Sequence, residues 1–284
     1  MARPELLATT EWLAENLGRS GVRVLDLRWR PDQTAPQVHA AGHIPGAALV
    51  DWRTELVEDS EDGGTIMLAG PDRVAALAQR TGITDGTTVV VYDDSQALFA
   101  SRAWWSLRAY GLDTVRILDG GYLDWVAEGR EVTKTRPPLG EANGFTVRGP
   151  NRTRLTTPDV RGLLGSPDVT LVDARAPAEY HGFEGNTKRL GHIPGAVNVP
   201  WATAVAEDGT FKPIEELRAI YGGKGITPDK DVIAYCRIGE RSSHSWFVLH
   251  ELLGYKRVRN YDGSWTEWGS MVGVPIEKPV AVPA

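Results

Sequence analysis

The sequence contains a single cysteine, Cys236, and its position favours a reactive thiol. The apolar run 231–235 before it is typical of a strand, a polar loop follows at 237–241, and the next segment has a helical pattern. Backbone N–H groups converge where a strand passes into a helix, and the helix dipole favours an anion there. Because both effects stabilise a thiolate, we expect a lowered thiol pKa and a cysteine nucleophile. The alternative is an inert cysteine that packs as a small apolar side chain.

Composition limits the classes of protein that this chain can be. Its 284 residues are 42% hydrophobic and 24% charged, as in ordinary globular proteins with one or two domains. The net charge of −6 argues against general nucleic-acid or membrane-surface binding. One cysteine excludes an intrachain disulfide and Cys-rich metal sites, and the histidines show no metal-binding spacing, so we expect no metal and no cofactor.

The N-terminal segment has acidic residues where a signal peptide needs its apolar core, and no run of about 20 apolar residues is present. We therefore expect a cytoplasmic protein. We also expect a monomer or a weak dimer.

The chain repeats itself, which indicates a duplicated domain. The segment GHIPGA at 42–47 recurs letter for letter at 191–196. Three further pairs of segments occur in the same order: 24–28 with 171–175, 89–92 with 232–235, and 119–125 with 262–268. The last two pairs share one offset of 143 positions. A fixed offset over this many residues indicates two copies of a domain of about 130 residues.

Each half alternates β-rich runs with helical patterns. Strands are predicted at 22–28, 87–94 and 115–121 with helices at 71–82 and 101–111, and the second half repeats this with strands at 169–175, 231–236 and 257–263 and helices at 214–223 and 243–254. This alternation predicts an α/β fold whose buried strands are parallel. Ligands bind such sheets outside the carboxyl ends of the strands, which is where Cys236 lies.

The halves are joined by a segment with a linker composition, rich in proline and glycine. We place a first domain at 1–131, the linker at 132–152 and a second domain at 153–284.

The ordered, duplicated motifs resemble those of the tandem-domain rhodaneses, a family of sulfurtransferases. The second half has LVDAR at 171–175, GHIPGA at 191–196, a loop that starts with Cys236, and DGSWTEW at 262–268. The resemblance implies two rhodanese-like domains, each a mainly parallel five-stranded sheet flanked by helices. It also implies that Cys236 takes the sulfane sulfur of a donor as a persulfide and passes it to cyanide or another thiophilic acceptor.

The residues after the cysteine form the expected active-site loop: Arg237, Ile238, Gly239, Glu240, Arg241 and Ser242. A basic residue at Arg237 resembles the branch of the family that uses thiosulfate, and its guanidinium can bind the sulfonate group. Arg241 either contacts the anion or structures the loop. Ser242 either donates to the sulfur or, as the residue type favours, caps the helix. Glu240 is expected to point outward or to pair with an arginine.

One departure from the family pattern and one match to a branch of the family concern the donor. Glu179 stands where well-studied two-domain relatives have an arginine, and Arg189 resembles a second arginine of mercaptopyruvate-type relatives. We expect Arg189 to supply a substrate-binding cation or to be a surface residue. 3-Mercaptopyruvate therefore stays an alternative donor, and a non-catalytic sulfur carrier or oxidation sensor is the alternative from another class.

In the repeat, Asp93 is the equivalent of Cys236, 143 positions earlier in the chain. A carboxylate cannot hold a persulfide, so we expect an inactive first domain in which Asp93 is a surface-loop or helix-cap carboxylate. Structural roles are predicted for His43, His192 and His244, and for the repeated pairs Asp26 with Asp173 and Asp119 with Asp262.

A cysteine phosphatase is disfavoured, because Tyr235 replaces the usual histidine and the arginine of that loop falls one residue early.

Overall fold

The computed structural model describes residues 5–59, 65–137, 144–151 and 153–278. The chain divides into two compact units: unit 1 comprises Met1–Glu58, Leu68–Asn151 and Val205–Pro213, and unit 2 comprises Asp59–Met67, Arg152–Ala204 and Ile214–Ala284. The division after Asn151 falls inside the segment predicted as a linker. Residues 138–143 and 152 of that segment lie outside the described residues. The domain limits given above stay a prediction.

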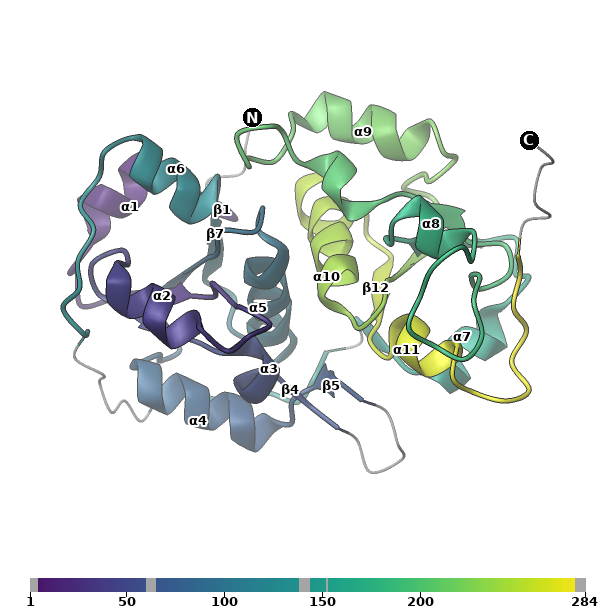
Figure 1. Cartoon of the computed structure of the whole chain (residues 1–284), viewed down its shortest axis with the longest axis horizontal. Helices are drawn as coiled ribbons and strands as arrows, with labels where there is room; N and C mark the ends of the chain where they lie inside the picture. The colour runs from purple at the N-terminus through teal and green to yellow at the C-terminus, as the bar shows by residue number, and fades with distance from the viewer. Residues whose placement is uncertain (1–4, 60–64, 138–143, 152, 279–284) are drawn as a thin grey trace. The chain divides into compact units, whose positions relative to one another are not determined.

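Unit 1 is built around a five-stranded sheet in the order β1-β7-β6-β2-β3, in which every neighbouring pair is parallel (Figure 1). The elements of the first half of the chain are β1 (Leu7–Ala8), α1 (Thr10–Asn16), β2 (Val22–Asp26), α2 (Ala35–Ala41), β3 (Ala47–Leu49), α3 (Trp52–Glu55), β4 (Val57–Glu58), β5 (Met67–Leu68), α4 (Pro71–Thr81), β6 (Thr88–Tyr92), α5 (Leu98–Ala109), β7 (Val115–Leu118) and α6 (Gly121–Ala127).

Unit 2 repeats this architecture with a second parallel sheet, in the order β10-β9-β11-β12-β8. The elements of the second half are β8 (Arg154–Leu155), α7 (Thr157–Leu163), β9 (Val169–Asp173), α8 (Pro177–Tyr180), β10 (Val197–Asn198), the 3-10 helix η1 (Trp201–Ala204), α9 (Ile214–Gly222), β11 (Asp231–Tyr235), α10 (Glu240–Trp246), the π-helical segment η2 (Phe247–Leu252), β12 (Val258–Tyr261) and α11 (Ser264–Trp268).

The two sheets share their strand order and their register. Asp26 of β2 lies opposite Tyr92 of β6, and Asp173 of β9 lies opposite Tyr235 of β11. The prediction of two α/β domains with five-stranded parallel sheets and flanking helices is confirmed. The middle strands β6 and β11 are buried over their last four residues, because helices cover both faces of each sheet. The residue that follows each middle strand, Asp93 in unit 1 and Cys236 in unit 2, therefore occupies the equivalent position in its own unit.

Several predicted boundaries are correct and some differ. Helix α4 ends at Gly82, as predicted, with φ of 72° in the left-handed region that glycine adopts readily. The helix expected at 243–254 starts earlier, at Glu240, and passes into the π-helical segment η2 after Trp246. The earlier start shortens the loop after Cys236 and brings Glu240 and Arg241 into the first helical turn.

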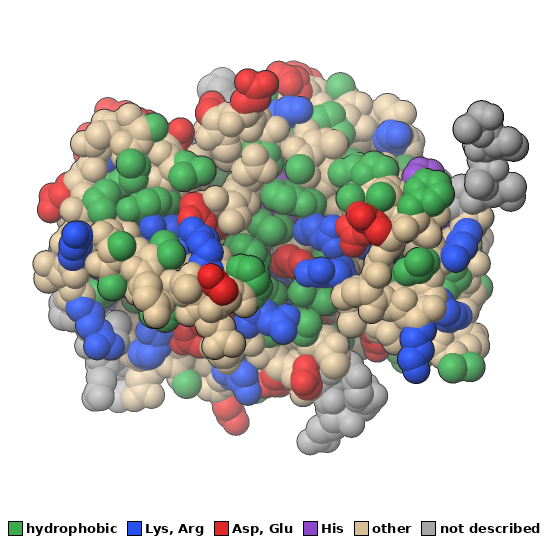
Figure 2. Space-filling view, viewed as in Figure 1, with side chains coloured by type: hydrophobic (Ala, Val, Ile, Leu, Met, Phe, Trp, Pro, Cys, Tyr) green, Lys and Arg blue, Asp and Glu red, His purple; other side chains and the backbone are tan. Residues whose placement is uncertain are grey.

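Two general features concern the surface. On the face shown in Figure 2, Lys and Arg side chains are interspersed with Asp and Glu side chains. Within the described ranges, no helix combines the length and the apolar content that a membrane crossing needs.

Candidate active site

Cys236 follows the middle strand of unit 2 and begins a four-residue loop that ends where α10 starts. The loop is held from the β12–α11 side. The Cys236 amide donates to Ser264 Oγ at 3.1 Å, and the Cys236 carbonyl accepts from the Trp265 amide at 2.9 Å. Gly239 closes the loop with φ of 96°, a left-handed conformation that glycine tolerates without steric cost. The backbone on both sides of the sulfur is therefore fixed.

The sulfur itself is enclosed, since Cys236 has 0% of its surface exposed. The Gly239 amide donates to Sγ at 3.1 Å, so the loop does present an N–H group to the sulfur. The thiol lies 3.8 Å from Oε2 of Glu240, to which it donates.

Burial raises the pKa of the Cys236 thiol, and the charge of Glu240 raises it further, while Arg241 and hydrogen bonds from Ser242 act in the opposite direction. The net result is a raised pKa, so the predicted lowering is wrong for this loop. Desolvation of the thiolate, together with a neighbouring carboxylate, outweighs the amides and the cation.

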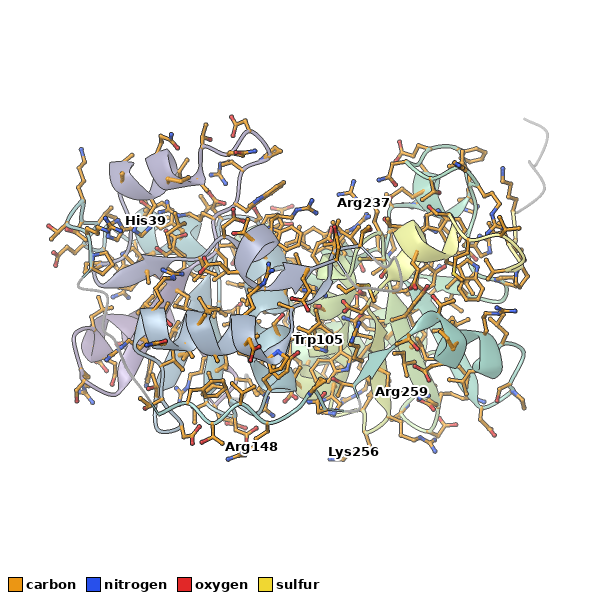
Figure 3. All side chains as sticks on the ribbon, turned by 90° about the horizontal axis from the view of Figure 1, so that it is seen from below. His39, Trp105, Arg148, Arg237, Lys256 and Arg259 are labelled. Carbon is orange, nitrogen blue, oxygen red and sulfur yellow. The ribbon has the colours of Figure 1, made fainter. Side chains whose placement is uncertain are left out.

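The side chain of Arg237 lies in solvent and that of Ile238 lies in the interior. Ile238 is buried, whereas Arg237 is exposed, and Figure 3 shows the labelled Arg237 side chain extending outward. Among the described residues, Arg237 makes no side-chain hydrogen bond or ion pair. Its carbonyl accepts from the Thr266 amide at 2.9 Å, which anchors the backbone and leaves the guanidinium available to a ligand.

Arg241 is committed to an ion pair. Its guanidinium donates to both carboxylate oxygens of Glu179, at 2.5 and 3.0 Å, in a bidentate arrangement. Burial acts to raise the pKa of Glu179, but the hydrogen bond and the charge of Arg241 outweigh it and the pKa is lowered. Glu179 is therefore ionised at neutral pH, and it offsets the charge of Arg241. This ion pair agrees with the structural possibility for Arg241, and contact with the donor anion stays a prediction.

Two expectations for the remaining site residues need correction, and Arg189 has contacts that were not predicted. Glu240 neither points outward nor pairs with an arginine, because it has only 5% of its surface exposed and contacts the thiol. Ser242 does not cap α10, because the helix begins two residues earlier with Gly239 as its N-cap. Its Oγ lies 3.2 Å from the Gly239 carbonyl, and Ser242 also hydrogen-bonds the sulfur, in line with the other role predicted for it. Arg189 donates to the backbone carbonyls of Val274 and Trp268, each at 2.9 Å, and to that of Met271.

The guanidinium of Arg189 satisfies carbonyls at and beyond the end of α11, groups that have no partner within the helix itself. The contacts agree with a structural role, and the role of Arg189 as a substrate-binding cation stays a prediction.

Ser264, Ser243 and Asn260 also shape the loop, and none of them was predicted. Ser243 Oγ donates to the Gly239 carbonyl at 2.7 Å, and Asn260 Nδ2 donates to Ser243 Oγ at 3.1 Å.

The backbone at Ser264 is left-handed, with φ of 51°, and its counterpart in the repeat, Gly121, is also left-handed, with φ of 62°. A Cβ on Gly121 would lie 2.4 Å from the Asp93 carbonyl oxygen. The repeated Asp-Gly-Ser and Asp-Gly-Gly motifs were the sequence signal for this contact.

The corresponding loop of unit 1 holds Asp93 in the place of the cysteine. Its carboxylate accepts four backbone N–H groups: Ser95 at 2.8 Å, Ala97 at 3.0 Å, and Phe99 and Ala100 at 2.8 Å. Asp93 is buried, so the surface-loop interpretation is wrong. Its carboxylate bonds the Phe99 and Ala100 N–H groups in the first turn of α5, as a cap does, although the N-cap residue itself is Ala97. Burial raises the pKa of Asp93 to about 6, although the N–H groups of Ala100, Ser95 and Ala97 oppose this.

The other repeated residues have the structural roles predicted for them. Buried ion pairs join Asp26 to Arg28 and Asp173 to Arg175. The rings of His43 and His192 bond the carbonyls of His39 and Tyr180 through Nδ1 at 2.8 and 2.9 Å. The buried ring of His244 meets that of Trp201 edge to face. Within the described segments, no cluster of three or more His, Cys, Asp or Glu side chains is arranged to hold a metal ion.

Comparison with known proteins matches both halves of the chain to one family. The model described as "Rhodanese-like domain" matches residues 9–128 and 156–271. A protein of Saccharopolyspora erythraea, provisionally named a thiosulfate sulfurtransferase, is 43% identical, with 98% of each chain covered. The sulfur carrier protein TtuD of Thermus thermophilus has the same identity and coverage.

Solved structures agree with these sequence matches. A structure of EanB with ergothioneine has a TM-score of 0.84 and 28% identity, and the match covers 99% of this chain and 72% of EanB. An EanB variant that carries a cysteine persulfide has the same TM-score, with 27% identity and coverage of 97% and 71%.

Proposed function

Because the chain belongs to the rhodanese-like family, we propose that it is a sulfurtransferase that carries sulfur as a persulfide on Cys236. The donor that the site fits best is thiosulfate, and the acceptor is cyanide or another thiophile. The observation that carries the proposal is the buried sulfur at the carboxyl end of the middle strand, with a backbone N–H group directed at it. A relative at 43% identity named as a sulfur carrier and a structural neighbour with a cysteine persulfide support the same chemistry.

The internal repeat supports the proposal that N–H groups of the loop can bond the outer sulfur of a persulfide. In unit 1 the carboxylate of Asp93 accepts four N–H groups of the equivalent loop and helix start. A carboxylate extends one bond further from the backbone than a thiol does. The outer sulfur of a persulfide on Cys236 would extend to a similar depth, where N–H groups at the start of α10 favour negative charge.

Arg237 is the residue that we assign to the donor. It is exposed, it follows the cysteine directly, and its guanidinium is not engaged by any other described side chain. Arg241, in contrast, is neutralised by Glu179. The planar guanidinium of Arg237 suits two oxygens of a sulfonate group, which would orient the sulfane sulfur toward Sγ.

The reaction has two half-steps. In the first, Cys236 Sγ forms a bond to the sulfane sulfur of thiosulfate, the sulfur–sulfur bond of the donor breaks, and sulfite leaves with the bonding electron pair. In the second, cyanide attacks the outer sulfur, thiocyanate forms, and the Cys236 thiolate is released. Covalent catalysis of this kind predicts ping-pong kinetics.

The test is a comparison of kcat/KM for thiosulfate and 3-mercaptopyruvate, each with cyanide as acceptor, in the wild type and in Cys236→Ser. We expect preference for thiosulfate and no transfer by the variant. Preference for 3-mercaptopyruvate would show that this compound, and not thiosulfate, is the better donor. Full activity of Cys236→Ser would contradict the persulfide mechanism.

A second candidate function is that of a sulfur carrier, which the similarity to TtuD favours. A carrier binds one sulfur per chain and releases it to a specific acceptor protein rather than turning over with cyanide. Product formation well above one equivalent of thiocyanate per chain would exclude a role restricted to carriage.

A further inference from the structure

Glu240 is a buried carboxylate whose placement is not explained by packing or by ion pairing. Acidic side chains are seldom fully buried without a partner of opposite charge. The nearest arginine in the sequence, Arg241, directs its guanidinium to Glu179 instead. Among the described residues, the hydrogen-bond partner of the Glu240 carboxylate is the Cys236 thiol, at 3.8 Å from Oε2. The ion pair of Arg241 with Glu179 thus leaves Glu240 free to accept from the sulfur.

A proton acceptor beside the sulfur suits the chemistry of the cysteine. The nucleophile in sulfur transfer is the thiolate, yet the thiol is buried and lies beside a negative charge, so its protonated form is favoured. A proton acceptor in contact with Sγ allows the thiol to lose its proton as it attacks, without a standing population of thiolate.

The other charged groups around the pair do not offer this function. From the loop, Arg237 is exposed and permanently protonated, and from α10 Arg241 is paired with Glu179 of α8. From the turn after β12, Asp262 is paired with Arg154, and the group of α11 that contacts Cys236 is the neutral Ser264.

We propose that Glu240 is a catalytic residue, the general base that takes the proton from Cys236 Sγ during sulfur loading and passes it to the departing sulfite. This inference rests on the proposed function. The Sγ–H bond breaks as the bond from Sγ to the sulfane sulfur forms, Oε2 accepts the proton, and sulfite leaves with the electron pair of the broken sulfur–sulfur bond. When sulfite takes the proton, the products are the persulfide anion and hydrogen sulfite, with no net change in charge or oxidation state.

The competing interpretation is a purely electrostatic one. An acidic residue in the first turn of a helix is favourable for the helix dipole. If Glu240 has only this role, its negative charge hinders the thiolate, and removing the charge accelerates the attack on the donor. The two interpretations therefore predict rate changes of opposite sign.

The experiment compares Glu240→Gln and Glu240→Asp with the wild type and with Glu251→Gln. Glu251 is a suitable control, because it is buried in the same helical stretch but bonds His250 rather than the sulfur. Two quantities are measured. The thiol pKa is obtained from the ultraviolet absorbance of the thiolate, with Cys236→Ser as background, and the rate of sulfur loading by thiosulfate is obtained by rapid quench across the pH range.

We expect the thiol pKa to fall in Glu240→Gln while sulfur loading at neutral pH slows by about 100-fold, within the range of general-base effects. The loading rate of the variant should then follow the thiolate fraction, and the solvent isotope effect of the wild-type step should be lost. Glu240→Asp should retain partial activity, and Glu251→Gln should load sulfur at the wild-type rate.

Faster loading in Glu240→Gln, in step with its larger thiolate fraction, would overturn the base assignment. Absence of loading in the wild type itself, with a normally titrating thiol, would instead overturn the proposed function. If Glu240→Gln does not fold, Glu240→Asp decides: an unchanged loading rate and isotope effect would contradict the proposal, and a slowed rate with the pH profile displaced would support it.

Discussion

The loops after β6 and β11 occupy equivalent places in the two units and differ in the group that they hold. In unit 1, four N–H groups bond the carboxylate of Asp93, a permanent part of the chain. In unit 2, the residue at this place is Cys236, and the Gly239 N–H group bonds its sulfur. The comparison shows that the scaffold directs backbone N–H groups at this point in both units, and that the side chain decides whether the group they bond is structural or reactive.

The backbones of the two loops also differ, in the type of residue that adopts a left-handed conformation. Gln96 and Ala97 adopt left-handed φ values of 59° and 61°, whereas unit 2 has the left-handed residue Gly239 in its loop. A left-handed non-glycine residue costs about 1 kcal/mol or more, so the bonds from the Ser95 and Ala97 amides to Asp93 help to hold a loop that its own residue types disfavour. Glycine removes this cost in unit 2, so that loop does not depend on a fixed anion.

The largest expected effect comes from removing the thiol or moving it between the units. Cys236→Ser should reduce sulfur transfer by about 1000-fold or more, because the nucleophile is lost. The double variant Asp93→Cys with Cys236→Ser should stay inactive, because residues 94, 96 and 97 of unit 1 lack the arginine, the glycine and the glutamate of the catalytic loop. Thiocyanate production is the measurement, with circular dichroism to establish folding. Transfer by the double variant would show that the scaffold and a thiol suffice.

The second effect is on stability and depends on pH. Because the pKa of Asp93 is raised from 3.8 to about 6, its contribution to stability is fully present below pH 3.8 and is lost as the pH rises through 6. Relative to Asp93→Asn, the wild type should lose about 3 kcal/mol of unfolding free energy over that range. Urea unfolding at a series of pH values measures this difference. A difference that does not vary with pH would show that Asp93 titrates normally.

A smaller effect is expected from Arg237→Gly. Loss of the exposed guanidinium should raise KM for thiosulfate by about 10-fold, because a charge-assisted contact to the sulfonate is lost. KM for an uncharged persulfide donor should change little. Arg148 lies at the surface of unit 1 (Figure 3), so Arg148→Gly serves as a control for the loss of one positive charge. Equal changes in KM for both donors would show that Arg237 does not bind the sulfonate group of the donor.

The smallest effect is expected from Glu179→Gln. The neutral amide leaves the charge of Arg241 uncompensated beside the sulfur, which should lower the thiol pKa and reduce KM for thiosulfate by about 3-fold. The thiolate absorbance and steady-state kinetics measure the two changes. A higher KM would indicate that Arg241 needs its partner in order to be positioned, and that its charge does not act on the donor.

Much of this site could be predicted from the sequence, because the relevant signals are local or repeated. The position of Cys236 after a strand, the parallel sheets and the structural role of the paired Asp26 and Asp173 all follow from short motifs that occur twice. The repeat also identified Asp93 as the counterpart of the cysteine, and its helix-cap role follows from its residue type.

What could not be predicted concerns contacts between distant segments and the degree of burial. Arg241 pairs with Glu179, which is 62 positions away, and Arg189 bonds carbonyls about 80 positions away, so no local pattern reveals either partner. The start of α10 at Glu240 depends on the backbone of Gly239, and it turned a residue expected in solvent toward the sulfur. The thiol pKa was predicted in the wrong direction, because the sequence does not show that Cys236 has 0% of its surface exposed.

The central claim is that Cys236 carries a transferable sulfur, and the mass of the intact protein tests it most directly. The wild type and Cys236→Ser are each incubated with thiosulfate, weighed by mass spectrometry, then treated with cyanide and weighed again. The account predicts that the wild type gains the mass of one sulfur atom, that cyanide removes it, and that the variant gains nothing. Oxygen additions that only a dithiol reverses, or the same gain of sulfur in Cys236→Ser, would contradict it.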